Sequence, residues 1–364
     1  MREIILISFL GPDQPNQFTR LMQVLSAHSL QILDVGQAVI HNQLTLGIVV
    51  ASEDQTATAL AMKEILILAH DIGLTVRFKP ISATEYDQWV KEGGRTRYIV
   101  TALAPELNAS HLQAVTQIVS AQGFNIETVT RLSGRPALDG HSSGPKRACV
   151  EFGLKGQMLD AAAMRAACLR LSTELNVDVA VQEDNAYRRN RRLVCFDMDS
   201  TLIEQEVIDE LAIEAGVGAQ VAEITERAMQ GELDFQQSFR ARVALLKGMD
   251  ASVLPKIAER LTITEGAERL ISTLKALGYR TAILSGGFQY FAEYLQSKLD
   301  IDEVHANALD VQDGVVTGEV KGHIVDGARK AFLLGEIAQE MGISLEQTIA
   351  VGDGANDLPM LSIA

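Results

Sequence analysis

The stretch LVCFDMDSTL, residues 193–202, determines how this chain is interpreted. Residues 193–196 have the length and apolar character of a buried strand, and they lead directly into Asp197 and Asp199. A carboxylate at the end of a buried strand is costly unless something compensates its charge. The acidic pair therefore indicates a metal site or a reaction centre.

Strands and helices alternate after this stretch, which predicts an α/β domain with a parallel sheet. Further strands are expected at YRTAILSGG (279–287), EVHANALDV (303–311) and TIAVGDG (348–354), with helices between them. In such a sheet the chemistry gathers at the carboxyl ends of the strands. Segment 204–264 interrupts the alternation with charged, helical sequence, which indicates an insertion.

Polar clusters end three of these strands, at DMDST (197–201), SGG (285–287) and GDGAND (352–357), and Lys330 begins a helix. This combination suits phosphoryl transfer, because a phosphate dianion needs magnesium and lysine to neutralise it and N–H or hydroxyl donors to hold it. Asp197 can attack phosphorus, and Asp199 can protonate the leaving group and then activate water. Asp353 and Asp357 offer Mg²⁺ further oxygen ligands.

Each cluster taken alone also fits an ordinary structural role. DMDST can be the capped start of a helix, SGG and GDGAND can be glycine turns, and Lys330 can be a solvated lysine. Their joint occurrence, in this order and each at a strand or helix end, makes purely structural roles improbable.

Residues 193–364 resemble the haloacid dehalogenase superfamily, whose four motifs match DMDST, Ser285, Lys330 and GDGAND in order. The resemblance implies a Rossmann-like sheet with a helical cap at about 204–264. Asp197 would be the nucleophile and a magnesium ligand. Asp199 would be the general acid and base, with its backbone carbonyl on the metal, and Asp353 the remaining ligand. The phosphate would be held by Ser285, Gly286, Lys330 and Asn356, with Asp357 supporting the site from behind.

More narrowly, FDMDSTLIEQEVIDELA, MQGELDFQQSFRARVALLKG and GDGANDLPML resemble the phosphoserine phosphatases. The resemblance implies hydrolysis of O-phospho-L-serine to L-serine and phosphate, the last step of serine biosynthesis. Glu206 would bind the substrate ammonium and Arg242 its carboxylate, with Met229 and Phe235 on the apolar side. Alternatives are a phosphatase or phosphotransferase acting on another small phosphate ester, such as phosphohomoserine, and a non-catalytic amino-acid sensor. The family usually continues with another strand and helix, so a sequence ending at Ala364 is either truncated or shortened.

The first half of the chain contains an internal repeat. The segment starting IILISFLGPDQPN at Ile4 aligns with the segment starting YIVTALAPELN at Tyr98, and each copy reads as β-α-β-β-α-β. That order is the ferredoxin-like α+β arrangement. We expect the modules at residues 1–84 and 96–183, a linker at 184–192 and the phosphatase domain at 193–364.

The two modules resemble ACT domains, which bind amino acids near their first strand-to-helix loop and often assemble in pairs. In this chain the loop contains Gly11, Asp13 and Asn16. Glycine allows close approach, a helix start favours a carboxylate and Asp13 can meet an ammonium group, so L-serine is the expected regulator. A plain turn with a helix cap accounts for the loop equally well. The resemblance also implies a homodimer formed through these modules.

The composition limits the partners. The chain has 364 residues with 32 basic and 47 acidic side chains, and a net charge of -15 disfavours nucleic acid and anionic membranes. The amino-terminal sequence predicts neither a signal peptide nor a membrane span. Three cysteines without metal-ligand spacing fit a reducing cytoplasm.

Overall fold

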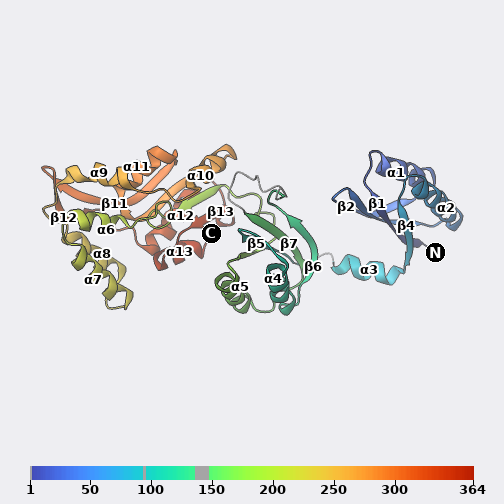
Figure 1. Ribbon diagram of the computed structural model, residues 1–364, viewed down its shortest axis with the longest axis horizontal. Coiled ribbons are helices and arrows are strands. Elements are labelled where there is room, and N and C mark those ends of the chain that lie inside the picture. Colours follow the sequence, from blue (N-terminus) through green and yellow to red (C-terminus); the bar gives the residue numbers. More distant parts are fainter. Residues whose placement is uncertain (1, 93–95, 136–146) are drawn as a thin grey trace. The chain divides into compact units, whose positions relative to one another are not determined.

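The computed structural model describes residues 2–92, 96–135 and 147–364. The chain divides into two compact units, Met1–Ala180 and Val181–Ala364. Figure 1 labels many of the elements of both units, and each unit is described by itself. Within the described part of the chain, no helix combines the length and apolar character needed to cross a bilayer.

The first unit contains two modules with the expected β-α-β-β-α-β order (Figure 1). Module 1 consists of β1 (Glu3–Pro12), α1 (Gln17–Ala27), β2 (Gln31–Ile40), β3 (Gln43–Ser52), α2 (Gln55–Asp71) and β4 (Thr75–Ile81). Module 2 consists of β5 (Arg97–Ala104), α4 (Ala109–Ala121), β6 (Asn125–Arg131), β7 (Ala148–Lys155), α5 (Ala161–Leu175) and β8 (Asp178–Glu183). The sheet orders, β2-β3-β1-β4 and β6-β7-β5-β8, confirm the ferredoxin-like fold.

Strand periodicity explains why each sheet is covered on one face by its helices. In β7 every second residue is buried, and the inward residues of β1 and β3 meet Leu21 of α1 and Ile65 of α2. The helix starts are fixed by side chains that accept backbone N–H groups, as Asp54 does for α2 and Asp160 for α5. Both modules therefore have apolar cores of their own.

One helix of the first unit was not expected. Helix α3 (Ala83–Glu92) follows β4, and it begins where Glu85 accepts hydrogen bonds from the backbone and hydroxyl of Ser82. The sequence SATE at 82–85 carries this capping-box pattern, which is the local signal for a helix start.

The second unit is built on a sheet of order β12-β11-β10-β9-β13. Its strands are β9 (Leu193–Phe196), β10 (Arg280–Phe288), β11 (Glu303–Gln312), β12 (Val315–Lys321) and β13 (Thr348–Val351). Strand β9 is central and pairs in parallel with β10 and β13. All four of its residues are buried, because Val194 and Phe196 face one apolar core while Leu193 and Cys195 face another.

Strands β11, β10, β9 and β13 pair in parallel, as expected, and the further strand β12 at the edge of the sheet is antiparallel. Strand β12 turns back from β11 and pairs with it in antiparallel fashion, so the two form a hairpin at one edge. Its turn contains Asp313 at φ 51° and Gly314 at φ 81°. An Asp-Gly pair between apolar alternating segments is the usual sequence signal for such a hairpin, and it was overlooked.

Helices cover the two faces of this sheet. One core includes residues of α10 (Ala267–Ala276) and α11 (Gln289–Leu299), and the other includes residues of α12 (Gly327–Glu340) and α13 (Leu358–Leu361). The carboxyl ends of β9, β10 and β13 are left accessible to the inserted segment.

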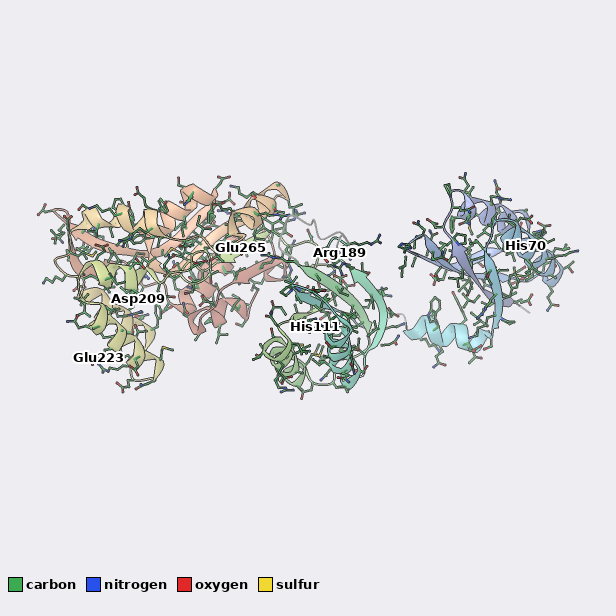
Figure 2. The ribbon with its side chains drawn as sticks, viewed as in Figure 1. His70, His111, Arg189, Asp209, Glu223 and Glu265 are labelled. Carbon is green, nitrogen blue, oxygen red and sulfur yellow. The ribbon has the colours of Figure 1, made fainter. Side chains whose placement is uncertain are left out.

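The insertion after β9 is helical, as expected. It contains α6 (Val207–Glu214), α7 (Gly218–Met229), α8 (Phe235–Ala244), the short 3-10 helix η1 (Ala251–Val253) and α9 (Leu254–Arg260). Figure 2 shows Asp209 on α6 and Glu223 on α7. The segments that lead into and out of the insertion lie side by side, since Ile203 and Ile263 form an antiparallel β-bridge. After α8 the chain is held to the β12 hairpin, since Gly248 N donates to Val316 O at 2.9 Å.

Candidate active site

A buried lysine between two aspartates forms the floor of the site. Lys330 Nζ lies 2.7 Å from Asp197 Oδ2 and donates a hydrogen bond to Asp357 Oδ1, also at 2.7 Å. Asp197 follows β9, Lys330 lies in the first turns of α12 and Asp357 ends the short 3-10 helix η3 (Ala355–Asp357). Lys330 and Asp357 are fully buried, so the charges are tolerated because they compensate one another.

The backbone fixes both carboxylates of this cluster. Asp197 Oδ1 accepts the N–H of Met198 at 2.7 Å, and Asp357 Oδ2 accepts the N–H of Gly354 at 3.0 Å. Gly352 allows the second contact, because a Cβ at this position would lie 2.4 Å from Asp357 Cγ. Gly352 therefore serves close packing around Asp357.

Three carboxylates of the described residues are close enough to share a cation. One oxygen each from Asp197, Asp353 and Asp357 lies within 4.8 Å of the other two, and Thr201 Oγ1 donates to Asp353 Oδ1 at 3.1 Å. Hard oxygen ligands of this kind suit a divalent cation such as Mg²⁺. Both oxygens of Asp357 already accept hydrogen bonds, which fits its expected supporting place behind Asp197 and Asp353.

Burial changes the protonation of the acidic pair. It raises the pKa of Asp197 from 3.8 to about 6, and the nearby Lys330 ammonium opposes that rise. The pKa of Asp199 is raised well above its usual value by burial first and then by the negative charges of Glu206 and Asp197. Asp199 is thus a carboxyl group that holds a proton readily, as a general acid must.

Asp199 also touches the end of β10 and the start of α6. Its Oδ1 accepts the N–H of Val207 at 3.2 Å, and its Oδ2 lies where a Cβ on Gly287 would approach to 2.5 Å. Gly287 was not predicted as a site residue. The signal for it was the second glycine of SGG, because only glycine lets the strand end approach a carboxylate this closely.

The expected phosphate-binding residues lie in one region of the unit. Ser285 is fully buried and its Oγ accepts the N–H of Gly287 at 2.9 Å, while Gly286 and Asn356 line the pocket. The buried Asn307 donates to Gly286 O at 2.8 Å and accepts the N–H of Val325 at 2.8 Å. Asn307 was missed, although a lone amide within the apolar strand sequence EVHANALDV was a signal for it.

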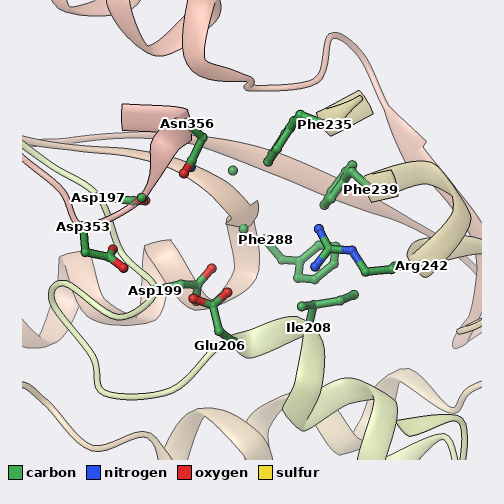
Figure 3. Close-up of a pocket in the computed structure, with 13 residues that line it drawn as sticks. Asp197, Asp199, Glu206, Ile208, Phe235, Phe239, Arg242, Phe288, Asp353 and Asn356 are labelled. Carbon is green, nitrogen blue, oxygen red and sulfur yellow. The ribbon is translucent and has the colours of Figure 1, made fainter. Parts of the chain in front are cut away.

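A pocket joins these strand ends to the inserted helices. Figure 3 shows Asp197, Asp353 and Asn356 on one side of it, with Arg242, Phe235 and Phe239 on the other. It is lined by Asp197, Asp199, Glu206, Ile208, Phe235, Phe239, Arg242, Gly286, Gly287, Phe288, Asp353, Gly354 and Asn356. Carboxylates thus face the guanidinium of Arg242 and aromatic rings across a single hollow.

Two polar residues of the inserted segment, Glu206 and Arg242, line this pocket. Arg242 and Glu206 approach one another across it (Figure 3), and burial lowers the pKa of Arg242 while it raises that of Glu206. The Nε of Arg242 is buried without a hydrogen-bond partner. A buried guanidinium with an unsatisfied donor is suited to bind a carboxylate.

Met229 does not reach the pocket, which corrects the expectation for it. It is the last residue of α7, its side chain is 84% exposed and it is absent from the lining. The buried residue of α7 is Val221, so this helix packs through another face. The apolar wall is formed instead by Phe235, as expected, with Phe239, Ile208 and Phe288. Phe239 was predictable, since it lies one helical turn beyond Phe235.

The loop proposed for a regulatory ligand lies in module 1. A Cβ on Gly11 would lie 2.7 Å from Gly73 O, so this glycine serves the approach of β1 to the α2–β4 turn. The buried Gln17 holds the loop, because its amide accepts from Gln14 N and donates to the carbonyls of Pro12 and Ile72. Asp13 and Asn16 are exposed, and Asn16 makes no side-chain cap bond.

The chain is similar to known proteins over most of its length. Residues 194–362 match the model of the haloacid dehalogenase-like hydrolase family, and residues 3–79 match that of the ACT domain. The chain is 38% identical to a phosphoserine phosphatase of Mycobacterium tuberculosis over 361 residues, 99% of this chain and 85% of that protein. It is also 38% identical to a phosphoserine phosphatase of Streptomyces coelicolor over 366 residues, 99% of this chain and 84% of that protein.

A solved structure supports the same relationship. A haloacid dehalogenase family hydrolase of Salmonella enterica serovar Typhi superposes with a TM-score of 0.61 at 30% sequence identity. The superposition covers 73% of this chain and 87% of that one.

Proposed function

The chain belongs to the phosphoserine phosphatase family of haloacid dehalogenase-like hydrolases, and we propose that it hydrolyses O-phospho-L-serine through a phosphoaspartate on Asp197. The observation that carries this proposal is the placement of the buried Lys330 against Asp197, which lines a pocket whose other wall holds Arg242. The products are L-serine and inorganic phosphate, and the reaction is the last step of serine biosynthesis.

Asp197 attacks phosphorus in the first half-reaction. Its Oδ2 is held by Lys330 and its Oδ1 by a backbone N–H, so the carboxylate is oriented before substrate binds. The phosphorus–oxygen bond to serine breaks as the new bond to Asp197 forms. Asp199 donates its proton to the departing serine oxygen, which its raised pKa favours.

The second half-reaction uses the same residues in the opposite sense. Asp199, now ionised, takes a proton from water, and the resulting hydroxide attacks phosphorus and releases Asp197. Ser285, Gly286, Asn356 and Lys330 hold the phosphate oxygens in both steps. Asp357 keeps Lys330 in place, since it accepts a hydrogen bond from its Nζ.

Magnesium is the cation that we assign to the carboxylates. Asp197, Asp353 and the backbone carbonyl of Asp199 would hold it, with Asp357 behind them. When bound, Mg²⁺ would neutralise phosphate charge and lower the repulsion between the phosphate and Asp197.

Substrate choice rests on the inserted helices. We assign the serine carboxylate to Arg242 and the ammonium to Glu206, because a buried guanidinium and a carboxylate are the matching groups. Phe235 and its neighbours exclude water from the reaction.

The domain division that fits these roles is the one expected from the sequence. It places two ACT modules at 1–84 and 96–183, a linker at 184–192 and the phosphatase domain at 193–364, with the cap at about 204–264. An amino acid, L-serine first, would bind module 1 near Asp13. Homodimerisation through the modules is supported by β2, an edge strand with the exposed apolar residues Val35, Val39 and Ile40.

The direct test is phosphate release from a panel of esters in the presence of Mg²⁺. O-phospho-L-serine should give the highest kcat/KM, above O-phospho-L-homoserine and p-nitrophenyl phosphate. A higher value for another ester would assign the same chemistry to a different substrate, and release of no phosphate from any ester would contradict the proposal.

A further inference from the structure

Ser200 adopts a backbone conformation that a side chain makes unfavourable. It directly follows Asp199, and its φ of +52° lies in the left-handed region. Glycine enters this region without strain, whereas most other residues do not. A serine at this position therefore requires a reason beyond the turn itself.

The hydroxyl of Ser200 supplies that reason. Its Oγ donates a hydrogen bond of 2.8 Å to Glu206 Oε1, and its backbone N–H donates to Gln205 O at 3.3 Å. Two bonds thus close the loop between the acidic pair and the start of α6. The hydroxyl binds Oε1 of Glu206 and makes no hydrogen bond to Oε2.

Glu206 is free for this contact because another residue caps its helix. Glu206 occupies the N-cap position of α6, yet its side chain makes no cap bond. The first N–H of the helix, on Val207, donates instead to Asp199 Oδ1 at 3.2 Å. The Glu206 carboxylate can therefore turn toward the pocket, which it lines (Figure 3).

We propose that Ser200 is a positioning residue that holds Glu206 Oε1 so that Oε2 faces the ammonium group of the substrate. Ser200 itself touches no reacting atom in this assignment. It acts through Glu206 and selects phosphate esters that carry an amine. The inference deepens the proposed function and rests on it.

The surrounding loop predicts that the effect is on recognition and not on folding. Gln205 Oε1 accepts the N–H of Thr262 at 2.9 Å, and Gln205 Nε2 donates to Thr262 Oγ1 at 3.1 Å. These bonds anchor the loop to the chain returning from the insertion. Loss of the Ser200 hydroxyl would release the carboxylate of Glu206 while the backbone stays anchored.

Two variants separate the hydroxyl from the turn. Ser200→Ala removes the hydroxyl and keeps the unfavourable Cβ, whereas Ser200→Gly removes the hydroxyl and relieves the backbone. The measurement is kcat/KM of the full-length enzyme with Mg²⁺ for O-phospho-L-serine and for 3-phosphooxypropanoate, the same ester without the amine. Ser272→Ala is the control, since Ser272 Oγ donates to Arg269 O within its own helix, α10.

Both variants should lower the ratio of the two kcat/KM values by about tenfold, because a hydrogen bond to a charged group has roughly that value in an equilibrium constant. The change should appear in KM for phosphoserine more than in kcat. Ser272→Ala should leave the ratio unchanged.

The outcomes distinguish the inference from the function on which it rests. A wild-type ratio near one would overturn the assignment of Glu206 to the ammonium group and this inference with it, whereas release of no phosphate from either ester would contradict the proposed function. A high wild-type ratio that survives in both variants would overturn the role of Ser200 alone. A loss in Ser200→Ala that Ser200→Gly restores would assign Ser200 to the turn and contradict the positioning role.

Discussion

Lys330 is the residue whose burial most clearly requires a chemical reason. A fully buried ammonium is costly, and two carboxylates at 2.7 Å offset that cost in this fold. Asp197 remains difficult to ionise all the same, because burial raises its pKa to about 6. The site therefore concentrates negative charge, and a bound cation would offset it when a phosphate dianion binds.

The raised pKa of Asp197 predicts how the cation affects stability. The folded protein binds more protons than the unfolded chain between pH 3.8 and about 6, so stability falls as pH rises through that range. Above it the carboxylate is charged, and a bound cation offsets the cost. Addition of Mg²⁺ should therefore raise Tm more at about pH 7.5 than at about pH 5.

Asp353→Asn provides the control for this thermal measurement. The variant should lose most of the Mg²⁺-dependent rise in Tm, because Asp353 is an assigned ligand with its own oxygen in the cluster. An equal rise at both pH values, or an unchanged rise in Asp353→Asn, would show that the cation binds elsewhere.

Gly287 gives a second prediction at the scale of the residue. Gly287→Ala would place a Cβ 2.5 Å from Asp199 Oδ2 and 2.7 Å from Met198 Cε, so Asp199 must move. A displacement of Asp199, the proposed general acid, by about 1 Å should cost about 10²-fold in kcat. Gly335→Ala is the matched control, since nothing lies within 4 Å of its added Cβ. Wild-type kcat in Gly287→Ala would contradict the contact.

At the scale of the element, α8 presents one face to the pocket. Phe235, Phe239 and Arg242 follow at helical spacing, and the capping box of Asp234 and Gln237 starts the helix at Phe235. The same helix carries Arg240, which lines a separate hollow against β12. Two arginines of one helix thus serve as test and control.

Arg242→Ala should lower kcat/KM for O-phospho-L-serine by roughly 10- to 100-fold, the value of a charge-assisted pair with a carboxylate. Turnover of phosphoethanolamine, which lacks the carboxylate, should change much less. Arg240→Ala should change neither. Equal losses on both esters in Arg242→Ala would show that this residue supports the fold of the cap or general catalysis.

Elements also show how far sequence alone reaches. Strand β9 and the polar clusters were predictable, because paired carboxylates at the end of a buried apolar run are costly unless a metal or a reaction uses their charge. The β12 hairpin was missed, although its Asp-Gly turn is a local signal, because strand alternation was given more weight. Met229 was misplaced since its position depends on how α7 packs, which no local pattern encodes.

Contacts between distant segments could not be predicted either, because no local sequence pattern encodes how segments pack. Nothing near Asn307 indicates that its amide would meet Gly286 O and Val325 N–H. Likewise, the approach of Gly11 to Gly73 depends on the packed module. The residue types were readable, whereas their partners required the fold.

At the scale of the whole molecule, the match of module 1 to the ACT domain predicts a response of the phosphatase to an amino acid. L-serine shifts the protein toward the conformational or assembly state that binds it more tightly, and activity changes where the two states differ in activity. Asp13 is exposed and has the charge to meet an ammonium group, whereas the matching loop of module 2 contains Glu106 without the preceding glycine.

The full-length enzyme should therefore show a non-competitive component of inhibition or activation by L-serine. Asp13→Ala should remove that component and leave competitive product inhibition, while Glu106→Ala should keep both. Steady-state kinetics at several serine concentrations measure this. An unchanged non-competitive component in Asp13→Ala would exclude the loop of module 1 as the regulatory site.

The central claim, phosphoryl transfer from O-phospho-L-serine to Asp197, is tested most directly by trapping the enzyme during turnover. The full-length protein is mixed with O-phospho-L-serine and Mg²⁺, quenched in acid within one turnover and mapped by mass spectrometry. We predict one phosphoryl group on the peptide that contains Asp197, and none in Asp197→Asn, which should also release no phosphate above background. The exposed Glu223→Gln should label like the wild type. Phosphate release at the wild-type rate by Asp197→Asn, or labelling of another residue, would contradict the account.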